Sequence, residues 1–177
     1  MDEIVGLALK KWPNVPACYG WLGLDRRGDW YLRDDVVQST GDFKVSKGSR
    51  LVHGKLIEFI NRNYLKDESK RYYFQNGPQK VFVELELTPW VLRFDHKLQV
   101  ITQTEKVVQV LRAYTDEHGK VYLNTDKGIG VVRSMDMDIL ADELVRRKWK
   151  IEEIFEEELE RKFGFVRSPL KEKSQSN

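Results

Sequence analysis

The stretch that decides the fold runs from Arg62 to Leu87 and reads R-N-Y-L-K-D-E-S-K-R-Y-Y-F-Q-N-G-P-Q-K-V-F-V-E-L-E-L. A helix is predicted to end near Tyr64, and a polar loop leads from it into two aromatic-rich segments. Asn76-Gly77 separates these segments, and Asn-Gly is a pair that tight hairpin turns favour. From Val81 to Leu87, apolar residues alternate with polar or aromatic ones, as in a strand with one buried face. The stretch therefore predicts a helix followed by an antiparallel hairpin.

The residues before this stretch predict two helices and another hairpin. Residues 3–11 carry their apolar side chains on one side of a short helix, which Pro13 ends because a residue before proline disfavours the helical region. Two β-rich runs, at 19–24 and 29–32, flank a turn that closes with Gly28. A polar loop over 34–50 then precedes residues 51–64, where apolar positions recur at helical spacing.

The residues after Pro89 predict more strands and then a helical extension. Runs at 90–94, 98–102, 107–114, 121–123 and 129–132 are typical of a β-meander. From Asp136 to Phe163 the apolar residues recur at helical steps, and Gly164 suits a helix C-cap. We expect a helical extension over 136–164, as one helix or as two with a break near Trp149. The polar residues 168–177 predict a disordered tail.

These elements predict an α+β fold, in which antiparallel hairpins and a meander form a curved sheet. An N-terminal helix, a helix at about 51–64 and a C-terminal helical segment complete it. A length of 177 residues favours a single domain over residues 1–167. A hydrophobic content of 41% with 33% charged residues excludes global disorder.

Cysteine use and hydropathy bear on the compartment. Cys18 is the one cysteine, so an intramolecular disulfide framework is excluded and a reducing compartment fits better. No run approaches the roughly 20 apolar residues of a membrane span. We therefore expect a cytoplasmic protein without a membrane partner.

A turn pattern occurs twice in the sequence. The segments from Asp25 to Leu32 and from Asp116 to Leu123 both contain D-x-x-G, then any residue, then Trp or Val, and then Tyr-Leu. An internal duplication would produce this similarity. Hairpins also reuse the same turn residues independently, so both explanations stay open.

The motifs of metal, cofactor and nucleophile sites are missing from the sequence. His53, His96 and His118 are far apart and form no zinc-binding spacing. Gly128-Ile-Gly130 lacks the third glycine of a dinucleotide fingerprint. Cys18 has no neighbouring His or Lys and is expected to pack as a small hydrophobic residue. We therefore predict no catalytic residue, no metal and no cofactor.

One acidic pair has the spacing of a magnesium site. Asp136-Met-Asp138 places two carboxylates one residue apart, as in sites that bind Mg²⁺. The pair also stands where a helix is predicted to begin, and carboxylates stabilise the positive end of a helix dipole. The helix start is the favoured explanation.

The charge is unevenly distributed although the net charge is only +2. Residues 44–80 hold nine basic and three acidic side chains, so their balance is +6. With aromatic residues interleaved, this segment could bind RNA or another single-stranded nucleic acid. Residues 136–163 hold ten acidic and six basic side chains, a balance of −4, and could instead neutralise it within the molecule. The apolar stripe of 136–163 is expected to cover the sheet, or else to form a homodimer seam.

A candidate binding surface combines amide, aromatic and arginine side chains, which are the groups that shaped polar pockets use. The same residue types cap helices and fill turns, and that structural role is the alternative. The candidate residues are Trp12, Asn14, Tyr19, Trp21, Asn61, Arg62, Asn63, Tyr64, Tyr73, Gln75 and Asn76.

Three segments resemble a known group of proteins: W-P-N-V-P-A-C-Y-G-W-L-G-L-D from Trp12, F-I-N-R-N-Y from Phe59, and Y-F-Q-N-G-P-Q-K-V-F-V from Tyr73. They are similar to small proteobacterial proteins that form a domain of unknown function. The resemblance covers roughly residues 1–130. It implies a bacterial cytosolic setting, and it brings no activity, cofactor or catalytic residue.

The leading functional hypothesis is a non-enzymatic binding or regulatory module. It would use the polar-aromatic surface to bind a protein partner or a small polar ligand. A binder of RNA or single-stranded nucleic acid through the basic 44–80 segment is the alternative. A small enzyme whose residues converge only in space is the third possibility. The chain is expected to be a monomer or a homodimer.

Overall fold

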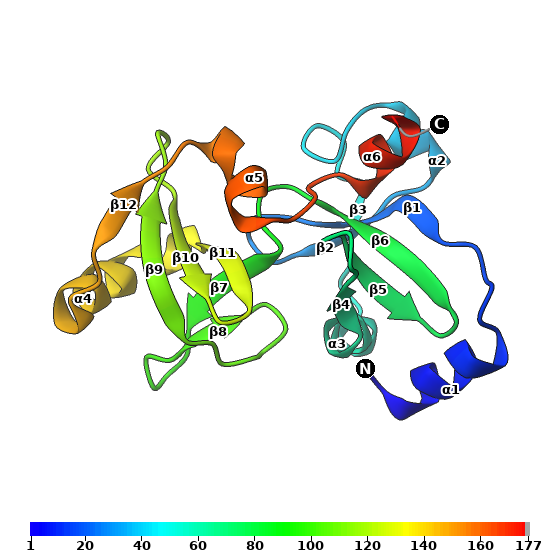
Figure 1. Cartoon of the computed structure of the whole chain (residues 1–177), viewed down its shortest axis with the longest axis horizontal. Helices are drawn as coiled ribbons and strands as arrows, with labels where there is room; N and C mark the ends of the chain where they lie inside the picture. Colours follow the sequence, from blue (N-terminus) through cyan, green and yellow to red (C-terminus); the bar gives the residue numbers. More distant parts are fainter. Residues whose placement is uncertain (176–177) are drawn as a thin grey trace. The chain divides into compact units, whose positions relative to one another are not determined.

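The computed structural model describes residues 1–175 and confirms the predicted α+β class (Figure 1). Contacts between residues divide the chain into two compact units. The first unit contains residues 1–25 and 29–86 with the C-terminal segment from Phe165, and the second contains residues 26–28 and 87–164. The single domain over 1–167 stays a prediction, because compact units of one chain can fold together or separately.

The first unit is built around a six-stranded mixed sheet with the strand order β3-β2-β1-β6-β5-β4. Strands β1 and β6 are parallel, and the other neighbouring strands are antiparallel. In chain order its elements are α1 (Glu3–Lys11), β1 (Cys18–Leu24), β2 (Trp30–Leu32), α2 (Asp35–Ser39), β3 (Ser49–Arg50), α3 (Gly54–Arg62), β4 (Tyr64–Lys66), β5 (Tyr72–Asn76), β6 (Gln79–Leu85) and α6 (Pro169–Gln175).

The second unit holds the other six-stranded mixed sheet, with the order β12-β9-β10-β11-β7-β8. Two strand pairs are parallel here, β7 with β11 and β9 with β12. Its elements are β7 (Trp90–Phe94), β8 (Val100–Thr102), β9 (Val110–Thr115), β10 (Val121–Thr125), β11 (Gly128–Val132), the 3-10 helix η1 (Ser134–Asp136), α4 (Met137–Arg147), β12 (Ile151–Glu153), the 3-10 helix η2 (Glu156–Glu158) and α5 (Leu159–Phe163).

The two sheets repeat one five-strand topology. In the first unit the hairpin β1-β2 is followed by the meander β4-β5-β6, and the first hairpin strand pairs in parallel with the last meander strand. In the second unit the hairpin β7-β8 and the meander β9-β10-β11 have the same relationship. The shared strand orders are β2-β1-β6-β5-β4 and β8-β7-β11-β10-β9. The sequence predicted the hairpins but not the parallel pairs that join them.

Four turns in these sheets have the same geometry. Each begins with an aspartate whose carboxylate accepts a hydrogen bond of 2.8–3.0 Å from the backbone N–H four residues later. The residue before that N–H has a positive φ of 60° to 91°. The four aspartates are Asp25, Asp67, Asp95 and Asp116.

The repeated strand order makes different turns equivalent from those that share the D-x-x-G motif. Asp25 in the first hairpin corresponds to Asp95, and Asp67 in the first meander corresponds to Asp116. The D-x-x-G segments at Asp25 and Asp116 therefore stand at non-equivalent positions. Their similarity therefore reflects the use of the same turn type at two different positions. What the two units repeat is the order of five strands.

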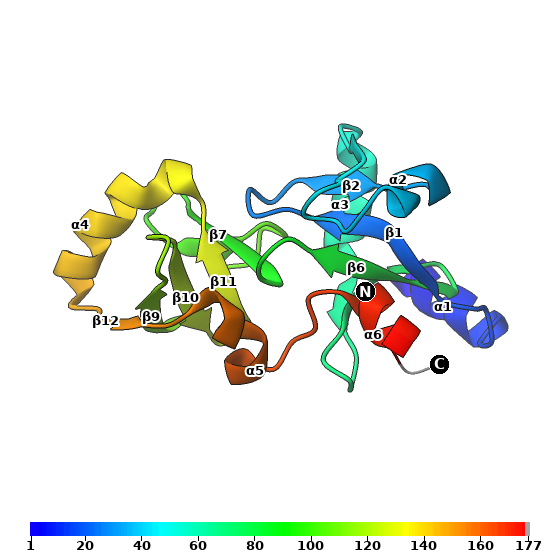
Figure 2. The same cartoon turned by 90° about the horizontal axis from the view of Figure 1, so that it is seen from above.

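The two predicted helices of the first unit are present. The predicted helix at about 51–64 spans Gly54–Arg62, and the His53 imidazole accepts a hydrogen bond from the N–H of Leu56 at its start. Phe59 packs edge-on against Phe74, with 5.4 Å between ring centroids, so α3 covers one face of the sheet. In Figure 2, α6 lies against the opposite face of the same sheet.

The C-terminal part differs from the predicted helical extension. Helix α4 ends at Arg147, its C-cap residue Lys148 adopts a left-handed conformation with φ 55°, and Ile151–Glu153 pair with β9 as β12. The 136–163 segment is therefore interrupted by a strand and offers no continuous helical seam for a dimer. The break falls beside the predicted position at Trp149.

Residues 169–175 form helix α6, within the range 168–177 where the sequence predicted a disordered tail. Residues 176 and 177 of that predicted tail lie outside the described residues. The buried carboxylate of Glu84 on β6 accepts hydrogen bonds from the hydroxyl of Ser168 (2.5 Å) and from the backbone N–H of Leu170 (3.0 Å). Glu84 holds this polar tail in place although it lies 84 residues from Ser168 in the sequence. The composition of the tail therefore gives no indication that the tail is ordered.

Candidate functional site

The end of α3 uses two predicted site residues to hold α1. Asn63 is fully buried, and its side-chain oxygen accepts a 2.7 Å hydrogen bond from the N–H of Asp2. Its amide group donates to the carbonyl of Phe59 at 2.9 Å. Arg62 pairs with the Asp2 carboxylate at 3.1 Å, and this bond holds the pKa of Asp2 below its ordinary value. These groups cap and join two helices, so a ligand would have to compete with them.

Asn61 and Tyr64 belong to the packing around a buried tryptophan. The indole N–H of Trp30 donates a 2.9 Å hydrogen bond to the side-chain oxygen of Asn61. The ring of Tyr64 meets Trp30 edge-on at 5.3 Å and lies 5.4 Å from Tyr72. Trp30, Tyr64 and Tyr72 are all buried, and burial raises the pKa of Tyr64 well above its ordinary value. This cluster forms part of the core of the first unit.

Gln75 and Asn76 serve the hairpin between β5 and β6. Gln75 is 1% exposed, and its amide group donates a 2.9 Å hydrogen bond to the carbonyl of Gly77. Its backbone N–H donates to the carbonyl of Asn63, which links the hairpin to the end of α3. Asn76 is exposed and pairs with Gln79 across the turn. The amide of Gln75 thus fixes the turn that the Asn76-Gly77 pair predicts.

Three predicted site residues lie near the N-terminus and are exposed. Trp12 ends α1, Asn14 lies in the turn that follows, and Trp21 lies on β1. The ammonium of Lys11 lies 4.5 Å from the ring centroid of Trp12. Within residues 1–175, no hydrogen bond or ring contact connects these three residues to one another. The structure therefore does not bring them into one constellation.

Two predicted tyrosines do come together, on the face of the first sheet that carries α6. Tyr19 on β1 stacks on Phe82 of β6, with ring centroids 4.7 Å apart and planes at 26°. Tyr73 on β5 is directly opposite Phe82 in the antiparallel register and meets its ring at 63° and 5.9 Å. Phe82 is buried, whereas both tyrosines are half-buried. The parallel pairing of β1 with β6 makes this row of three rings.

A cation lies over each ring of this row. The Lys173 ammonium of α6 lies 4.5 Å from the Tyr19 centroid, and the Lys80 ammonium lies 4.9 Å from that of Tyr73. The Arg71 guanidinium lies 4.6 Å from the Phe82 centroid. Burial raises the pKa of Tyr73, with a further contribution from the negative charge of Asp67. We name Tyr19, Phe82, Tyr73, Lys80, Arg71 and Lys173 the aromatic–cation surface.

Of the predicted candidate binding residues, Tyr19 and Tyr73 belong to this surface, and Arg71 and Lys80 belong to the basic 44–80 segment that the sequence offered for nucleic-acid binding. The sequence places Phe82 on one face of a strand and predicts no function for it, and Lys173 lies in the tail that is predicted to be disordered. The periodicity of 81–87 put Phe82 on the same face as Glu84, which was an available signal. The contact of Lys173 with Tyr19 had no signal in the sequence, because it depends on how α6 packs.

Asp116 has the most extensively hydrogen-bonded carboxylate of the second unit's turns. It accepts from the hydroxyl of Tyr122 (2.6 Å) and from the backbone N–H groups of His118 (2.9 Å) and Lys120 (2.8 Å). Burial would raise the pKa of Asp116, but these donors and the Lys120 charge more than offset it and lower the pKa. The carboxylate stabilises the turn, and its lowered pKa does not suit it to accept a proton near neutral pH.

The described residues contain neither a metal-binding cluster nor a helix suited to span a membrane. Within residues 1–175, no group of three or more His, Cys, Asp or Glu side chains is arranged to hold a metal ion. None of the helices in that range combines the length and apolar character needed to cross a bilayer.

The fold and the surface together define an α+β protein with two six-stranded sheets that share a five-strand topology, and with an aromatic–cation surface on the first sheet. The chain belongs to the family DUF2944, described as “Protein of unknown function (DUF2946)”, which matches residues 1–170. The predicted membership of an uncharacterised family is thereby confirmed. The match extends beyond the expected limit near residue 130 and includes α4, α5 and the start of α6.

Comparison with solved structures finds two DUF1285 family proteins. The one from Silicibacter pomeroyi has 14% sequence identity and a TM-score of 0.48, over 80% of this chain and 84% of that chain. The one from Shewanella baltica has 17% identity and a TM-score of 0.46, over 70% of this chain and 91% of that chain. A comparison with curated proteins finds no match. None of these results indicates a function.

Proposed function

We propose that this chain is a non-catalytic binding module that uses the aromatic–cation surface. The observation that carries the proposal is the row of Tyr19, Phe82 and Tyr73 with a cation over each ring. Half-buried tyrosines combine a rigid apolar body with a polar hydroxyl, which makes them common anchors at interfaces. The eleven predicted site residues thus reduce to Tyr19 and Tyr73 as candidates for direct ligand contact.

The ligand that fits this surface is an acidic segment of a partner protein. Lys80 and Lys173 hold two ammonium groups at the edge of the ring row, where carboxylates of a partner can pair with them. The tyrosine rings between them can pack against the apolar parts of the same segment. Complementary charge at such a rim increases the association rate and selects partners by sign.

Single-stranded nucleic acid is the second candidate, because stacked rings with cations are also its usual platform. Two observations favour the protein segment. Tyr72 and Phe74, two of the aromatic residues interleaved in the basic 44–80 segment, are buried. Four basic residues of the 44–80 segment are neutralised within the first unit, namely Lys47 by Asp25 and Glu86, Arg50 by Asp29, Arg62 by Asp2, and Arg71 by Asp67.

The test measures binding of the full chain to two defined probes. Fluorescence anisotropy would follow a labelled Glu- and Asp-rich peptide with one aromatic residue, and a labelled single-stranded oligonucleotide, at physiological ionic strength. We expect the peptide to bind and Tyr73→Ala to weaken it by about tenfold or more, as for a central interface anchor. Lys80→Ala and Lys173→Ala should each weaken it by about two- to fivefold.

Lys55→Ala is the matched control, because Lys55 is an exposed lysine on α3, on the opposite face of the sheet. It should leave peptide binding unchanged. Binding of the oligonucleotide alone, with a steep salt dependence, would favour the nucleic-acid candidate. If wild type binds neither probe, or if Lys55→Ala weakens binding as much as Lys80→Ala, the aromatic–cation surface is not the binding site.

A further inference from the structure

An uncovered sheet edge in the second unit carries a further candidate site, separate from the aromatic–cation surface. Strand β12 stands at one end of the strand order and pairs only with β9, so no other strand within residues 1–175 covers its outer side (Figure 1). All three of its residues, Ile151–Glu153, are exposed, whereas those of β8 at the opposite edge are buried. An edge of this kind offers backbone donors and acceptors to an added strand.

The backbone groups on the outer side of β12 belong to Ile151 and Glu153. The N–H of Ile154, directly after the strand, donates to the carbonyl of Thr115 on β9 at 3.0 Å. Alternate residues of a strand direct their N–H and C=O groups to the same neighbouring strand, so Glu152 also faces β9. The residues on either side of Glu152 therefore present their backbone groups to a partner.

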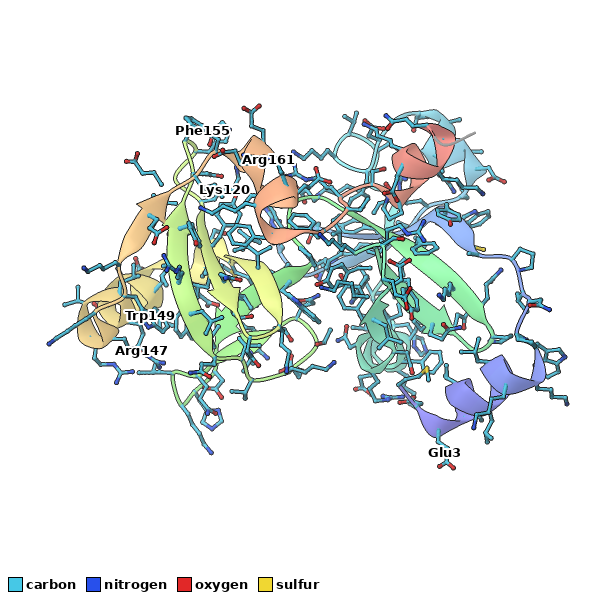
Figure 3. The ribbon with its side chains drawn as sticks, viewed as in Figure 1. Glu3, Lys120, Arg147, Trp149, Phe155 and Arg161 are labelled. Atoms are coloured by element: carbon cyan, nitrogen blue, oxygen red, sulfur yellow. The ribbon has the colours of Figure 1, made fainter. Side chains whose placement is uncertain are left out.

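A pocket of about 300 Å³ lies at the C-terminal end of this edge. The buried Ile154 and the 59% exposed ring of Phe155 are its apolar lining, and Figure 3 shows Phe155 at one end of the unit. Glu117, Glu153 and Glu158 add carboxylates, and none of the lining residues is basic. The volume is at the lower limit of the roughly 300 to 1,000 Å³ of small-molecule sites, so the pocket suits one long side chain of a partner.

The chain that forms the edge and the pocket is acidic. Residues 151–160 contain six glutamates and no basic residue. Three of these glutamates pair with basic side chains, namely Glu152 with Arg112 (2.7 Å), Glu156 with Lys120 (3.0 Å) and Glu158 with Arg161 (3.3 Å). Glu153 and Glu157 are exposed and form no ion pair with any residue of the described range 1–175. Negative charge therefore remains at the edge, with Glu153 in both the strand and the pocket.

The charge and the exposed ring identify the partner. A lysine or arginine can place its cation beside the Glu153 carboxylate while its methylene stem packs on the ring of Phe155. A second copy of this chain would bring the same glutamates to the edge, and like charges that face each other across a strand pair are destabilising. Nucleic acid would be repelled for the same reason, because its backbone is anionic.

We infer that β12 binds an extended basic segment of a partner protein, which adds a strand beside Ile151 and Glu153 and inserts a lysine or arginine into the pocket. Main-chain hydrogen bonds supply affinity in this mode of binding, and the pocket selects the side chain. The aromatic–cation surface is proposed to bind an acidic segment instead, so the two surfaces differ in the sign of their partner and are tested separately.

The test follows the full chain by two-dimensional amide NMR, at physiological ionic strength, with the peptide acetyl-Gly-Arg-Val-Arg-Val-Lys-Gly-amide as the probe. The amides of Ile151 and Glu153 should shift on binding and exchange with solvent at least about tenfold more slowly, because they become hydrogen-bonded. Proline in place of both valines keeps the charge but removes two N–H donors, and should weaken binding by about tenfold. Glutamate in place of the three basic residues should abolish it.

Variants test the pocket. Glu153→Gln removes one exposed charge and keeps the shape of the side chain, so it should weaken binding of the basic peptide by about two- to fivefold. Phe155→Ala removes the exposed ring and should weaken binding by a similar factor of about two to five. Glu3→Gln is the matched control, since Glu3 is an exposed glutamate on α1 in the first unit, and it should leave the affinity unchanged (Figure 3).

Several outcomes would overturn the inference. One is the absence of changes at the amides of Ile151 and Glu153 in wild type, a measurement that needs no variant to fold. Equal affinity for the proline peptide would show attraction by charge without strand pairing. An equal loss of affinity in Glu3→Gln and Glu153→Gln would show that the attraction is unspecific. If the same two amides become protected at high protein concentration without any peptide, a second copy occupies the edge.

Discussion

The hydroxyl of Tyr122 donates a 2.6 Å hydrogen bond to the buried carboxylate of Asp116, six residues earlier in the chain. The Tyr31 hydroxyl stands in the same relationship to Asp25, at a longer 3.4 Å. In both turns the other carboxylate oxygen accepts from the backbone N–H four residues on. In each unit, an aspartate thus connects its turn to a tyrosine on the strand that follows the turn.

Asp116→Asn should destabilise the protein at neutral pH by about 1–3 kcal/mol, because the buried charged acceptor of Tyr122 and of two backbone donors is lost. The pKa of Asp116 is lower in the folded than in the unfolded chain, so its contribution is present above the unfolded pKa and is lost as the pH falls through the folded pKa. The destabilisation should therefore shrink on acidification below about pH 4. Urea unfolding at neutral and acid pH measures it.

Asp142→Asn, at an exposed position on α4, is the control and should change the free energy of unfolding by less than about 0.5 kcal/mol. A destabilisation by Asp116→Asn that is the same at both pH values would show that packing, and not the charge, is responsible.

Lys70→Gly should stabilise the protein by up to about 1 kcal/mol. Lys70 has a φ of 65°, and a left-handed conformation costs a residue with a side chain about 1–2 kcal/mol. Glycine removes that cost, although its greater freedom in the unfolded chain returns about 0.4–1 kcal/mol. Chemical denaturation of the variant measures the balance.

The turn at Asp116 supplies the reverse test. Gly119 occupies the equivalent position with a φ of 74°, and a Cβ there would meet open space. Gly119→Ala should therefore lose about 1 kcal/mol through backbone strain alone. Glu68→Gly, in the same turn as Lys70 but without a positive φ, should destabilise. If Lys70→Gly destabilises as much as Glu68→Gly, the conformational explanation fails.

Local signals in the sequence predicted the hairpins and the helices at 3–11 and about 51–64, but not β12, α6 or the way distant elements meet. Asn76-Gly77 and the alternation from Val81 to Leu87 predicted the β5-β6 hairpin, because turn chemistry and period-two burial are local properties. The left-handed turns at Lys70 and Leu98 had no such signal, since they lack the glycine that marks Asp25 and Asp116. Aspartate, and not glycine, is the shared residue of the four turns.

The candidate site could also be predicted only in part, because its contacts join distant segments of the chain. Asn63 and Gln75 are predicted site residues because they are amides beside aromatic residues, and in the structure both satisfy backbone groups. Tyr19 and Phe82 stack because β1 and β6 pair in parallel across about sixty residues of sequence, and parallel pairing leaves no local turn signature. The sequence therefore identifies side chains that can form this surface, but it does not give the β1-β6 strand register that brings them together.

Arg33→Lys should destabilise the first unit by about 2–4 kcal/mol. The Arg33 guanidinium is buried and donates to three carbonyls, those of Ser46 (3.0 Å), Gly20 (3.2 Å) and Gly41 (2.7 Å). An ammonium cannot reproduce this planar set of donors, so buried carbonyls lose partners. Urea unfolding measures the loss, and proteolysis within residues 34–48 should accelerate.

Arg50→Lys provides the comparison, because Arg50 is exposed and pairs with Asp29 through a single contact. It should change the free energy of unfolding by less than about 0.5 kcal/mol. Equal stability of Arg33→Lys and Arg50→Lys would mean that the three carbonyl contacts do not hold the 34–48 segment.

Glu84→Gln should remove a pH dependence that the wild type shows above the ordinary range of a carboxyl group. Burial raises the pKa of Glu84, although the Ser168 hydroxyl, the Leu170 N–H and the Arg33 charge oppose the rise. The folded chain therefore holds this proton to higher pH than the unfolded chain, and stability falls as the pH rises from the unfolded pKa, near 4.5, through the folded one.

Other carboxylates also make the free energy of unfolding depend on pH. The quantity to measure is therefore the unfolding free energy of wild type minus that of Glu84→Gln at each pH. We expect this difference to be largest at low pH, to decline across the interval between the two pKa values, and to be level above it. Ser168→Ala removes a donor that favours the ionised form, so it should raise the pKa of Glu84 and extend the decline to higher pH. A difference that rises with pH would mean that the hydrogen bonds anchoring α6 outweigh the cost of burying the charge, and the anchor would then strengthen on ionisation rather than weaken.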